Sequence, residues 1–265
     1  MNYLGLQIAL GPDSDSFQFH CNRAAFSQVM IAGEYNWLLS QIMPGDVVID
    51  AGANTGMFSL LAAKRTGPSG KVIAIEPNTK NGLYLRRNLE ANRMNNIRIL
   101  NKALATEDDT FVGFSGGGVF GHIDSTGSEK VPTVSLPTIM SDLTSRAFLK
   151  MDIEGGELEI FSHPSIAQVL HKVEAMACEV HSAEAYNQVR DALSRGGFSV
   201  TRLHQESDFL TNVVRSWIRH PFALTSLYGA EGILVAKRIL RKKSKDEGES
   251  RFEAGIVYAS RIAHR

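Results

Sequence analysis

The sequence predicts an α/β fold built on a mainly parallel sheet covered by helices. Three observations support this prediction. Residues 46–101 alternate apolar runs with amphipathic stretches in the order strand, helix, strand, helix, strand. The apolar runs at 47–49 and 72–75 are continuous, which is typical of strands buried on both faces. A turn of small residues at 51–56 joins the first run to a helix, and such turns form pockets at the carboxyl ends of parallel strands.

The composition limits the classes of protein to be considered. The 265 residues include 28 basic and 28 acidic side chains, so no net charge favours a nucleic acid or an anionic membrane as partner. No apolar run approaches the ~20 residues that span a bilayer, and the first residues lack a signal-peptide pattern. Cys21 and Cys178 are far apart in the sequence and are expected to be reduced thiols. We therefore expect a cytoplasmic protein.

Residues 1–45 are predicted to form a partly helical lead-in that ends at the turn Pro44-Gly45. Apolar side chains recur there at helical spacing: Phe26, Val29, Met30, Tyr35, Leu38, Leu39 and Ile42. The main domain is predicted to span residues 46–238.

The first half of this domain has predicted strands at 46–50, 71–76 and 97–101. The helix after the first strand is predicted to end near residue 65. Thr79 is the expected N-cap of the second helix. Together these elements form one parallel mononucleotide-binding half.

Residues 107–138 interrupt this alternation. Two segments, 110–114 and 131–134, are predicted to pair as a hairpin. The glycine-rich stretch 115–122 between them fits a substrate loop and a plain connection equally well.

The second half has predicted strands at 148–153 and 173–181 and a helix over 183–195 that stops at Gly196-Gly197. Two late strands, at 198–203 and 232–237, are expected to close the sheet.

The late strands bracket an insertion at 204–231, where Phe209, Val213 and Trp217 are four residues apart. A lid, a dimer helix and ordinary packing all fit this spacing. Packing is the favoured interpretation, and a homo-oligomer stays open. Residues 239–265 are predicted to be a charged, solvated tail rather than a nucleic-acid contact.

The charge of the glycine turn selects a ligand. Asp50 lies two residues before Gly52, where a carboxylate would repel a pyrophosphate and attract a cation. The turn also departs from the G-x-G-x-x-G pattern of dinucleotide loops, with Asn54 marking the difference. S-adenosylmethionine carries a sulfonium and an ammonium group and no phosphate. The electrostatics therefore favour it over NAD or ATP.

Glu76 ends the second predicted strand. An acid at this place accepts hydrogen bonds from a ribose diol in dinucleotide sites and in S-adenosylmethionine sites alike. It supports an adenosine-type ligand without choosing between them. The alternative interpretation is an exposed acid that precedes Pro77 at the entry to a helix.

Several blocks of the sequence resemble the FkbM family of methyltransferases. They are Gly33-Glu34-Tyr35, residues 44–56 and residues 72–78, and the block at 149–157 is similar to the second signature of that family. The resemblance covers roughly residues 33–181. It implies a class I methyltransferase fold, with a seven-stranded, mainly parallel sheet flanked by helices and an antiparallel last strand. It also implies S-adenosylmethionine as methyl donor and a hydroxyl acceptor on a small molecule or glycan, such as a sugar or secondary metabolite.

Donor-binding residues follow from the turn and from the resemblance. The loop is expected to lie under the methionine part, with Glu76 on the ribose and Asn78 toward the adenine. Lys102 and Ala103 are expected at the adenine rim. Glu34 is expected either to close the methionine end or to cap a helix. The predicted donor-binding residues are Glu34, Asp50, Gly52, Asn54, Gly56, Glu76, Asn78, Lys102, Ala103 and Asp152.

Catalytic groups are expected at the carboxyl ends of the fourth and fifth strands. Asp152 is the first choice, to orient the acceptor or take its proton, and His181 is the alternative base because its ordinary pKa is ~6.5. Glu154 is a third candidate that could instead cap the next helix. Lys150 alternates with Asp152 on the same face, where it could hold an acid of the site or extend to the sheet edge.

No metal site is predicted, although Asp152, Glu179 and His181 offer oxygen and nitrogen ligands without a spacing that demands an ion. Two rival functions keep the pocket. One is an NAD(P)-dependent Rossmann oxidoreductase, and the other is an S-adenosylmethionine-binding module without turnover.

Overall fold

The computed structural model describes residues 2–3, 6–7, 29, 33–115, 122–123, 129–204 and 255–262. Several predictions fall outside these residues: the helical positions Phe26 and Met30, most of the glycine-rich stretch, the insertion beyond residue 204, and the strand at 232–237. Among the described residues, no helix has both the length and the apolar character needed to cross a membrane.

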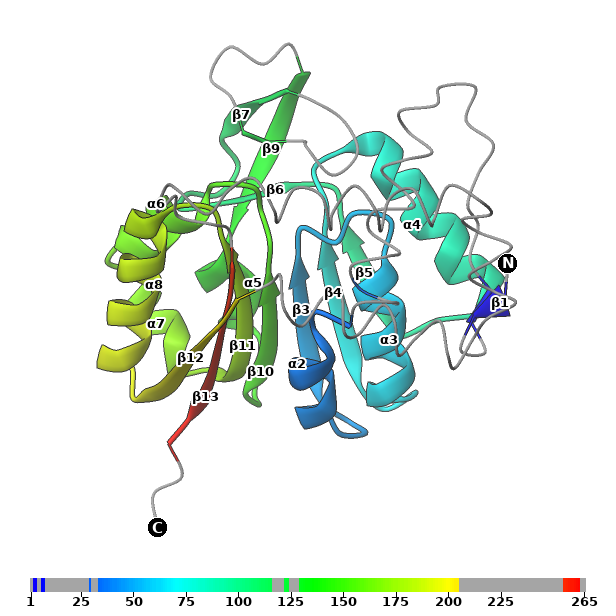
Figure 1. The fold of residues 1–265 in the computed structure, drawn as a ribbon. Coiled ribbons are helices and arrows are strands. Elements are labelled where there is room, and N and C mark those ends of the chain that lie inside the picture. The colour runs from blue at the N-terminus through cyan, green and yellow to red at the C-terminus, as the bar shows by residue number, and fades with distance from the viewer. Residues whose placement is uncertain are drawn as a thin grey trace, which may run out of the picture.

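A seven-stranded sheet forms the centre of the molecule (Figure 1). Its order is β12-β13-β11-β10-β3-β4-β5, and β13 is the one strand that runs antiparallel to its two neighbours. This confirms the predicted fold class, but the strand beside β12 is formed by residues 255–261 rather than by the predicted late strand at 232–237. The strands are β3 (Val47–Ala51), β4 (Lys71–Ile75), β5 (Ile97–Leu100), β10 (Ala147–Met151), β11 (Val173–Val180), β12 (Phe198–His204) and β13 (Gly255–Arg261).

Helices cover both faces of the sheet, as continuous apolar strands require. Along β3, Val48 packs in one core cluster and Ile49 in the other. The first cluster is covered by α2 (Asn36–Gln41), α3 (Met57–Thr66) and α4 (Thr79–Ala91). The second is covered by α5 (Leu136–Ser141), α6 (Glu157–Ser162), α7 (Ile166–Leu170) and α8 (Ala183–Arg195).

The predicted hairpin is confirmed and belongs to a second sheet, which projects from the main sheet (Figure 1). Its strands, in the order β6-β9-β7-β8, are β6 (Ala103–Ala105), β7 (Phe111–Ser115), β8 (His122–Ile123) and β9 (Glu129–Ser135). A separate small pair joins β1 (Asn2–Tyr3) to β2 (Leu6–Gln7).

The prediction of a solvated tail was wrong for residues 255–261. They form β13, which lies between β11 and β12 and pairs with both. Ile256, Val257, Tyr258 and Ala259 are all buried. In the sequence, this short apolar run follows a long charged stretch and therefore resembles part of a tail. In the structure, it forms the antiparallel strand between β11 and β12.

Candidate active site

The turn after β3 is held against the chain that follows β10. Gly52 and Asn54 have positive φ values of 75° and 50°. A Cβ atom on Gly52 would lie 1.7 Å from the carbonyl oxygen of Asp152, so only glycine fits there. Gly56, with φ of 87°, precedes α3 and would place a Cβ atom 2.2 Å from Leu85 Cδ1. The turn at 51–56, called the donor loop below, therefore contacts residues 149–157, called the Asp152 block below.

The amide groups of this turn are already bonded within the protein. The N–H groups of Gly52 and Ala53 both donate to the carbonyl oxygen of Ile75, at 3.0 and 2.9 Å. The Asn54 N–H donates to Glu76 Oε2 at 2.7 Å, and the Thr55 N–H donates to the side-chain oxygen of Asn54. A pyrophosphate needs such amides for its cradle. The geometry therefore disfavours NAD(P).

Glu76 connects the donor loop to the start of α4. Its carboxylate is 4% exposed and also accepts the N–H of Asn78 at 2.8 Å. Burial raises the pKa of Glu76 to about 7, although the N–H donors Asn78 and Asn54 act to lower it. Carboxylate lone pairs that remain can accept a ribose diol. Glu76 directly follows β4 and is buried, so the alternative of an exposed acid was wrong, while its contact with a ribose stays a prediction.

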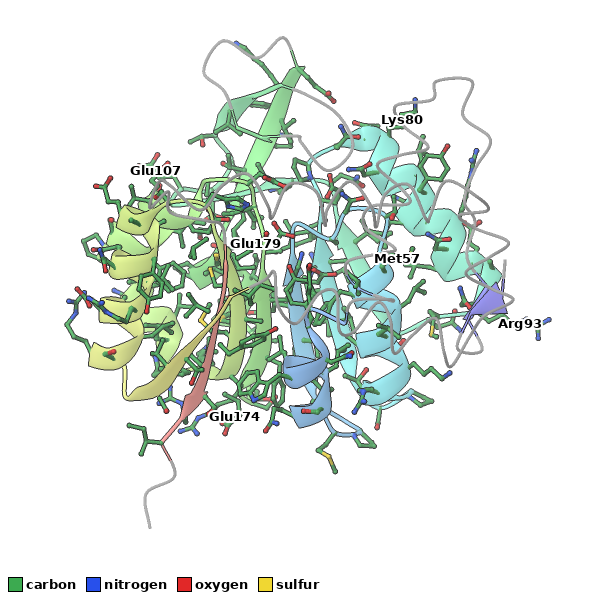
Figure 2. All side chains as sticks on the ribbon, viewed as in Figure 1. Met57, Lys80, Arg93, Glu107, Glu174 and Glu179 are labelled. Carbon is green, nitrogen blue, oxygen red and sulfur yellow. The ribbon has the colours of Figure 1, made fainter. Side chains whose placement is uncertain are left out.

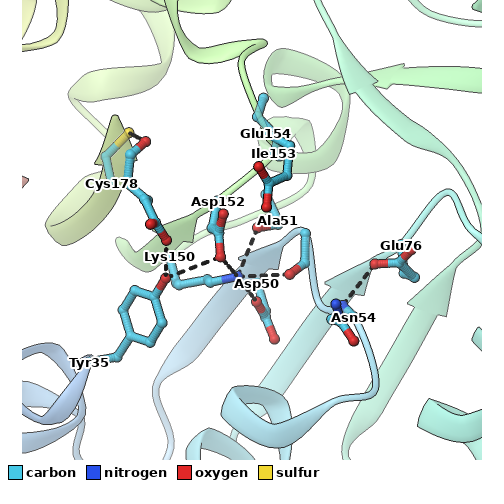
Figure 3. Close-up of polar contacts among 12 residues, drawn as sticks. Tyr35, Asp50, Ala51, Asn54, Glu76, Lys150, Asp152, Ile153, Glu154 and Cys178 are labelled. Carbon is cyan, nitrogen blue, oxygen red and sulfur yellow. Dashed lines mark hydrogen bonds and ion pairs between the residues drawn. The ribbon is translucent and has the colours of Figure 1, made fainter. Parts of the chain in front are cut away.

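Asp50 and Lys150 form a buried ion pair on the two central strands (Figure 3). The Asp50 side chain is fully buried, with Oδ1 at 3.4 Å from Lys150 Nζ and Oδ2 accepting the Ser59 hydroxyl at 2.6 Å. The charge of Asp50 is thus matched by an internal cation. Its predicted attraction for the donor is reduced by this pairing.

Lys150 reaches four acceptors at the ends of β3 and β10. Its ammonium group donates to the carbonyl oxygen of Gly52 at 2.7 Å and of Ala51 at 3.3 Å, and lies 3.6 Å from Asp152 Oδ2. Burial acts to lower the pKa of Lys150, but Asp50 and Asp152 raise it overall, so the lysine stays charged. Of the two predicted roles for this lysine, the structure shows the one that holds an acid of the site.

The hydroxyl group of Tyr35 lies close to the carboxylates of Asp152 and Glu179. The ring is 2% exposed, and the hydroxyl lies 3.2 Å from Asp152 Oδ2 and 3.4 Å from Glu179 Oε2. Burial, and after it the nearby Asp152 and Glu179 carboxylates, raise the pKa of Tyr35 well above its usual value. The hydroxyl therefore keeps its proton and acts as a donor.

The third predicted catalytic group, Glu154, lies beside His181. Glu154 has a φ of 56°, and its Oε2 is 3.5 Å from His181 Nε2. The buried carboxylate of Glu157, whose Oε2 is 3.8 Å from His181 Nδ1, is the main cause that raises the pKa of His181 to about 9. Burial, followed by Asp152, raises the pKa of Glu154 to about 7. At neutral pH, His181 is a cation rather than a base.

These three predicted residues can be bridged by one ion. Ligand atoms of Asp152, Glu154 and His181 lie within 4.8 Å of one another. In this set Glu154 takes the place that the sequence analysis gave to Glu179. A metal ion would have to displace the proton of His181. The absence of a metal stays a prediction.

Glu34 lies close enough to Asp152 for the two carboxyl groups to interact. It is half-buried, and burial and Asp152 raise its pKa to about 7. Its carboxylate Oε2 is buried without a hydrogen-bond partner among the described residues. Its backbone oxygen accepts a hydrogen bond from the Tyr258 hydroxyl.

The remaining predicted donor residues have structural partners of their own. Asn78, rather than Thr79 as predicted, is the N-cap of α4, because its side-chain oxygen accepts the N–H groups of Lys80 and Asn81 at 3.0 Å. Lys102 pairs with Asp109 at 2.8 Å. Ala103, in β6, is buried. Their contacts with a donor stay predictions.

The fold and this site are compatible with an S-adenosylmethionine-dependent methyltransferase of the α/β class, and the family comparison shows that class. The model of the methyltransferase FkbM domain matches residues 50–200. This span includes the donor loop, Glu76 and the Asp152 block. The chain belongs to the FkbM methyltransferase family, as its sequence blocks suggest, and its methyl donor is S-adenosylmethionine.

Several solved methyltransferases match this chain at low sequence identity. Precorrin-6y C5,15-methyltransferase from Geobacter metallireducens is 17% identical, with a TM-score of 0.42 over 63% of this chain and 72% of the other. Fibrillarin from Aeropyrum pernix, with bound S-adenosylmethionine, is 12% identical, with a TM-score of 0.42 over 89% and 74%. A methyltransferase from Aquifex aeolicus is 15% identical, with a TM-score of 0.39 over 66% and 85%. No curated protein matches.

Several residues that the structure brings into the site had no catalytic or donor-binding role predicted from the sequence. Tyr35 appears in the family resemblance only as a neighbour of Glu34. Glu157 was part of the second signature, yet it is fully buried and accepts the N–H groups of Ile153 and Gly155 at 3.0 Å. Glu179 was weighed only as a metal ligand. Alternation along a strand indicates which residues share a face, but not which distant helix end covers them.

Proposed function

We propose that this methyltransferase methylates a hydroxyl group on a sugar, glycan or secondary metabolite. The observation that carries the proposal is the group of carboxylates at the carboxyl ends of β10 and β11, with Asp152 nearest the donor loop. Carboxylates are acceptor-only groups when ionised, so they bind hydroxyl donors well. Figure 2 shows Glu179 near the centre of the structure, close to the ends of β10 and β3.

The residues present fit the donor. Glu76 offers acceptor oxygens for the ribose. Glu34 adds a carboxylate oxygen that has no hydrogen-bond partner among the described residues. S-adenosylmethionine, when bound, supplies an electrophilic methyl group.

The roles of the protein side chains follow from their geometry. Asp152 accepts the hydrogen bond of the acceptor hydroxyl, orients its oxygen toward the donor and takes its proton as the new bond forms. Lys150 holds the Asp152 carboxylate close to the Gly52 carbonyl group. His181 is protonated at neutral pH, which favours Asp152 over His181 as the base.

Methyl transfer from labelled S-adenosylmethionine to a panel of polyols, sugars and hydroxylated metabolites tests the proposal. Asp152→Asn is expected to lower turnover about 100-fold or more, because a positioned base contributes on that order. Asp142→Asn, at an exposed residue beyond the end of α5, is the matched control and should keep full turnover. Binding of the donor with no methylated product from any hydroxyl acceptor would favour the module without turnover.

A further inference from the structure

Tyr35 contacts two carboxylates of the site, Asp152 and Glu179, from a segment that precedes the main sheet in the sequence. Its hydroxyl lies within hydrogen-bond distance of Asp152, which follows β10, and of Glu179, which lies in the neighbouring strand β11. Figure 3 shows the Tyr35 ring below Asp152, with its hydroxyl group directed toward Asp152 and Lys150. The Tyr35 hydroxyl group can thus donate a hydrogen bond to either of two carboxylates, one just after β10 and one in β11.

The position of the Tyr35 ring is fixed on several sides. It packs edge-on against Phe58, with ring centroids 5.6 Å apart, and Lys150 Nζ lies 5.4 Å from its centroid. Such ring and cation contacts have preferred geometries. These contacts therefore fix the aromatic ring, and with it the position of the hydroxyl group.

A second tyrosine holds the segment that carries Tyr35. The Tyr258 hydroxyl, from β13, donates to the backbone oxygen of Glu34, and the Tyr258 ring packs edge-on against Trp37 at 5.0 Å. Tyr258 thereby contacts Glu34, which precedes Tyr35, and Trp37, which follows it in α2. The hydroxyl of Tyr258 bonds a backbone oxygen, whereas the hydroxyl of Tyr35 bonds carboxylates.

Two groups use the same oxygen of Asp152. Tyr35 donates to Oδ2, and Lys150 Nζ lies 3.6 Å from Oδ2 as well. Both partners are buried, so they restrict the rotation of a carboxylate whose side chain is 24% exposed. Both contacts use Oδ2, so Oδ1 is the Asp152 oxygen that neither partner holds.

We propose that Tyr35 is a positioning residue for methyl transfer: with Lys150 it holds Asp152 by Oδ2, so that Oδ1 faces the acceptor hydroxyl. This inference rests on the proposed function, because it assigns a task to the base of that reaction. It gives the 33–42 segment a part in turnover that does not require contact with the donor.

Tyr35→Phe removes the hydroxyl and keeps the ring, so it tests the hydrogen bonds alone. We expect kcat to fall about 10- to 100-fold, the range for losing a hydrogen bond to a charged group. Donor affinity, measured by calorimetry, should not change. Tyr84→Phe is the matched control, since it removes the hydroxyl of another buried tyrosine, in α4, to which no part of the site is assigned. It should keep kcat.

Two outcomes would overturn the inference. One is an equal loss of kcat in both variants, which would mean general loosening. The other is weaker donor binding by Tyr35→Phe with kcat unchanged, which would mean a donor-binding role.

Crystal structures of wild type and Tyr35→Phe with the demethylated donor give a readout that needs no turnover. The wild type should show Asp152 in one orientation, and the variant should show it rotated. If no acceptor is methylated by wild type, the proposed function fails, while an unmoved Asp152 in the variant separately contradicts the positioning role.

Discussion

Lys150 donates a hydrogen bond of 2.7 Å to the carbonyl oxygen of Gly52, across the two central strands of the sheet. The same ammonium group neutralises Asp50 beneath the loop and contacts Asp152 beside it. One buried cation therefore joins the donor loop to the proposed base. We therefore expect this lysine to set the spacing between the donor loop and Asp152.

Lys150→Met is expected to destabilise the fold strongly. It leaves the fully buried Asp50 carboxylate without its cation, and breaking a buried pair from one side typically costs about 3 to 5 kcal/mol. Urea unfolding measures the change in the free energy of unfolding. The double variant Asp50→Asn with Lys150→Met should recover part of the loss, since it removes the unpaired charge. A single variant as stable as wild type would contradict the pairing.

Gly52→Ala is expected to cost more stability than Gly67→Ala. Both glycines have positive φ values, 75° and 63°, so alanine is strained at either, by about 1 to 3 kcal/mol. Only at Gly52 would the new Cβ atom also collide with the Asp152 carbonyl group; at Gly67 it meets nothing within 4 Å. Thermal unfolding of the two variants compares them. Equal losses would mean that the loop and the Asp152 block do not pack as described.

Donor affinity is expected to rise with pH because of Glu76. Its pKa is raised to about 7, and the ribose hydroxyls need the ionised carboxylate as acceptor. A free Glu76 that is mostly protonated at pH 6 must lose its proton on binding, which weakens affinity there by about tenfold relative to pH 8. Calorimetry at both pH values checks this. Glu76→Gln should bind weakly and show a smaller dependence, whereas an identical slope in this variant would assign the titration to another group.

His181 is expected to titrate near pH 9 because of the buried carboxylate of Glu157. Since its folded pKa is raised above the unfolded value, its contribution to stability is fully present below pH ~6.5 and lost as pH rises through about 9. Nuclear magnetic resonance of the imidazole measures the pKa directly. Glu157→Gln should lower that pKa, and a histidine that titrates at its ordinary value in wild type would refute the assignment.

The parallel half of the fold could be predicted from sequence because its signals are local. Continuous apolar runs predicted β3 and β4, and the turn of small residues located the donor loop. The strand β13 could not be predicted in the same way. Its seven residues become part of the sheet only through pairing with β11 and β12, which lie far away in the chain.

The site was predictable to a similar extent. Asp152 and Lys150 share a strand face, so alternation linked them. The contact between Tyr35 and Asp152 joins residues 117 positions apart, and no local pattern encodes it. The same holds for the pairing of Asp50 with Lys150, which turns an apparent donor contact into an internal ion pair.

Methyl transfer is proposed to take place between the Gly52 loop and Asp152, and a crystal structure with the demethylated donor bound tests this placement. We expect the ribose hydroxyls on the Glu76 carboxylate and the sulfur atom facing Asp152, with Lys150 still bonded to the Gly52 carbonyl group. A donor bound with its ribose away from Glu76, or with its sulfur turned from Asp152, would contradict it.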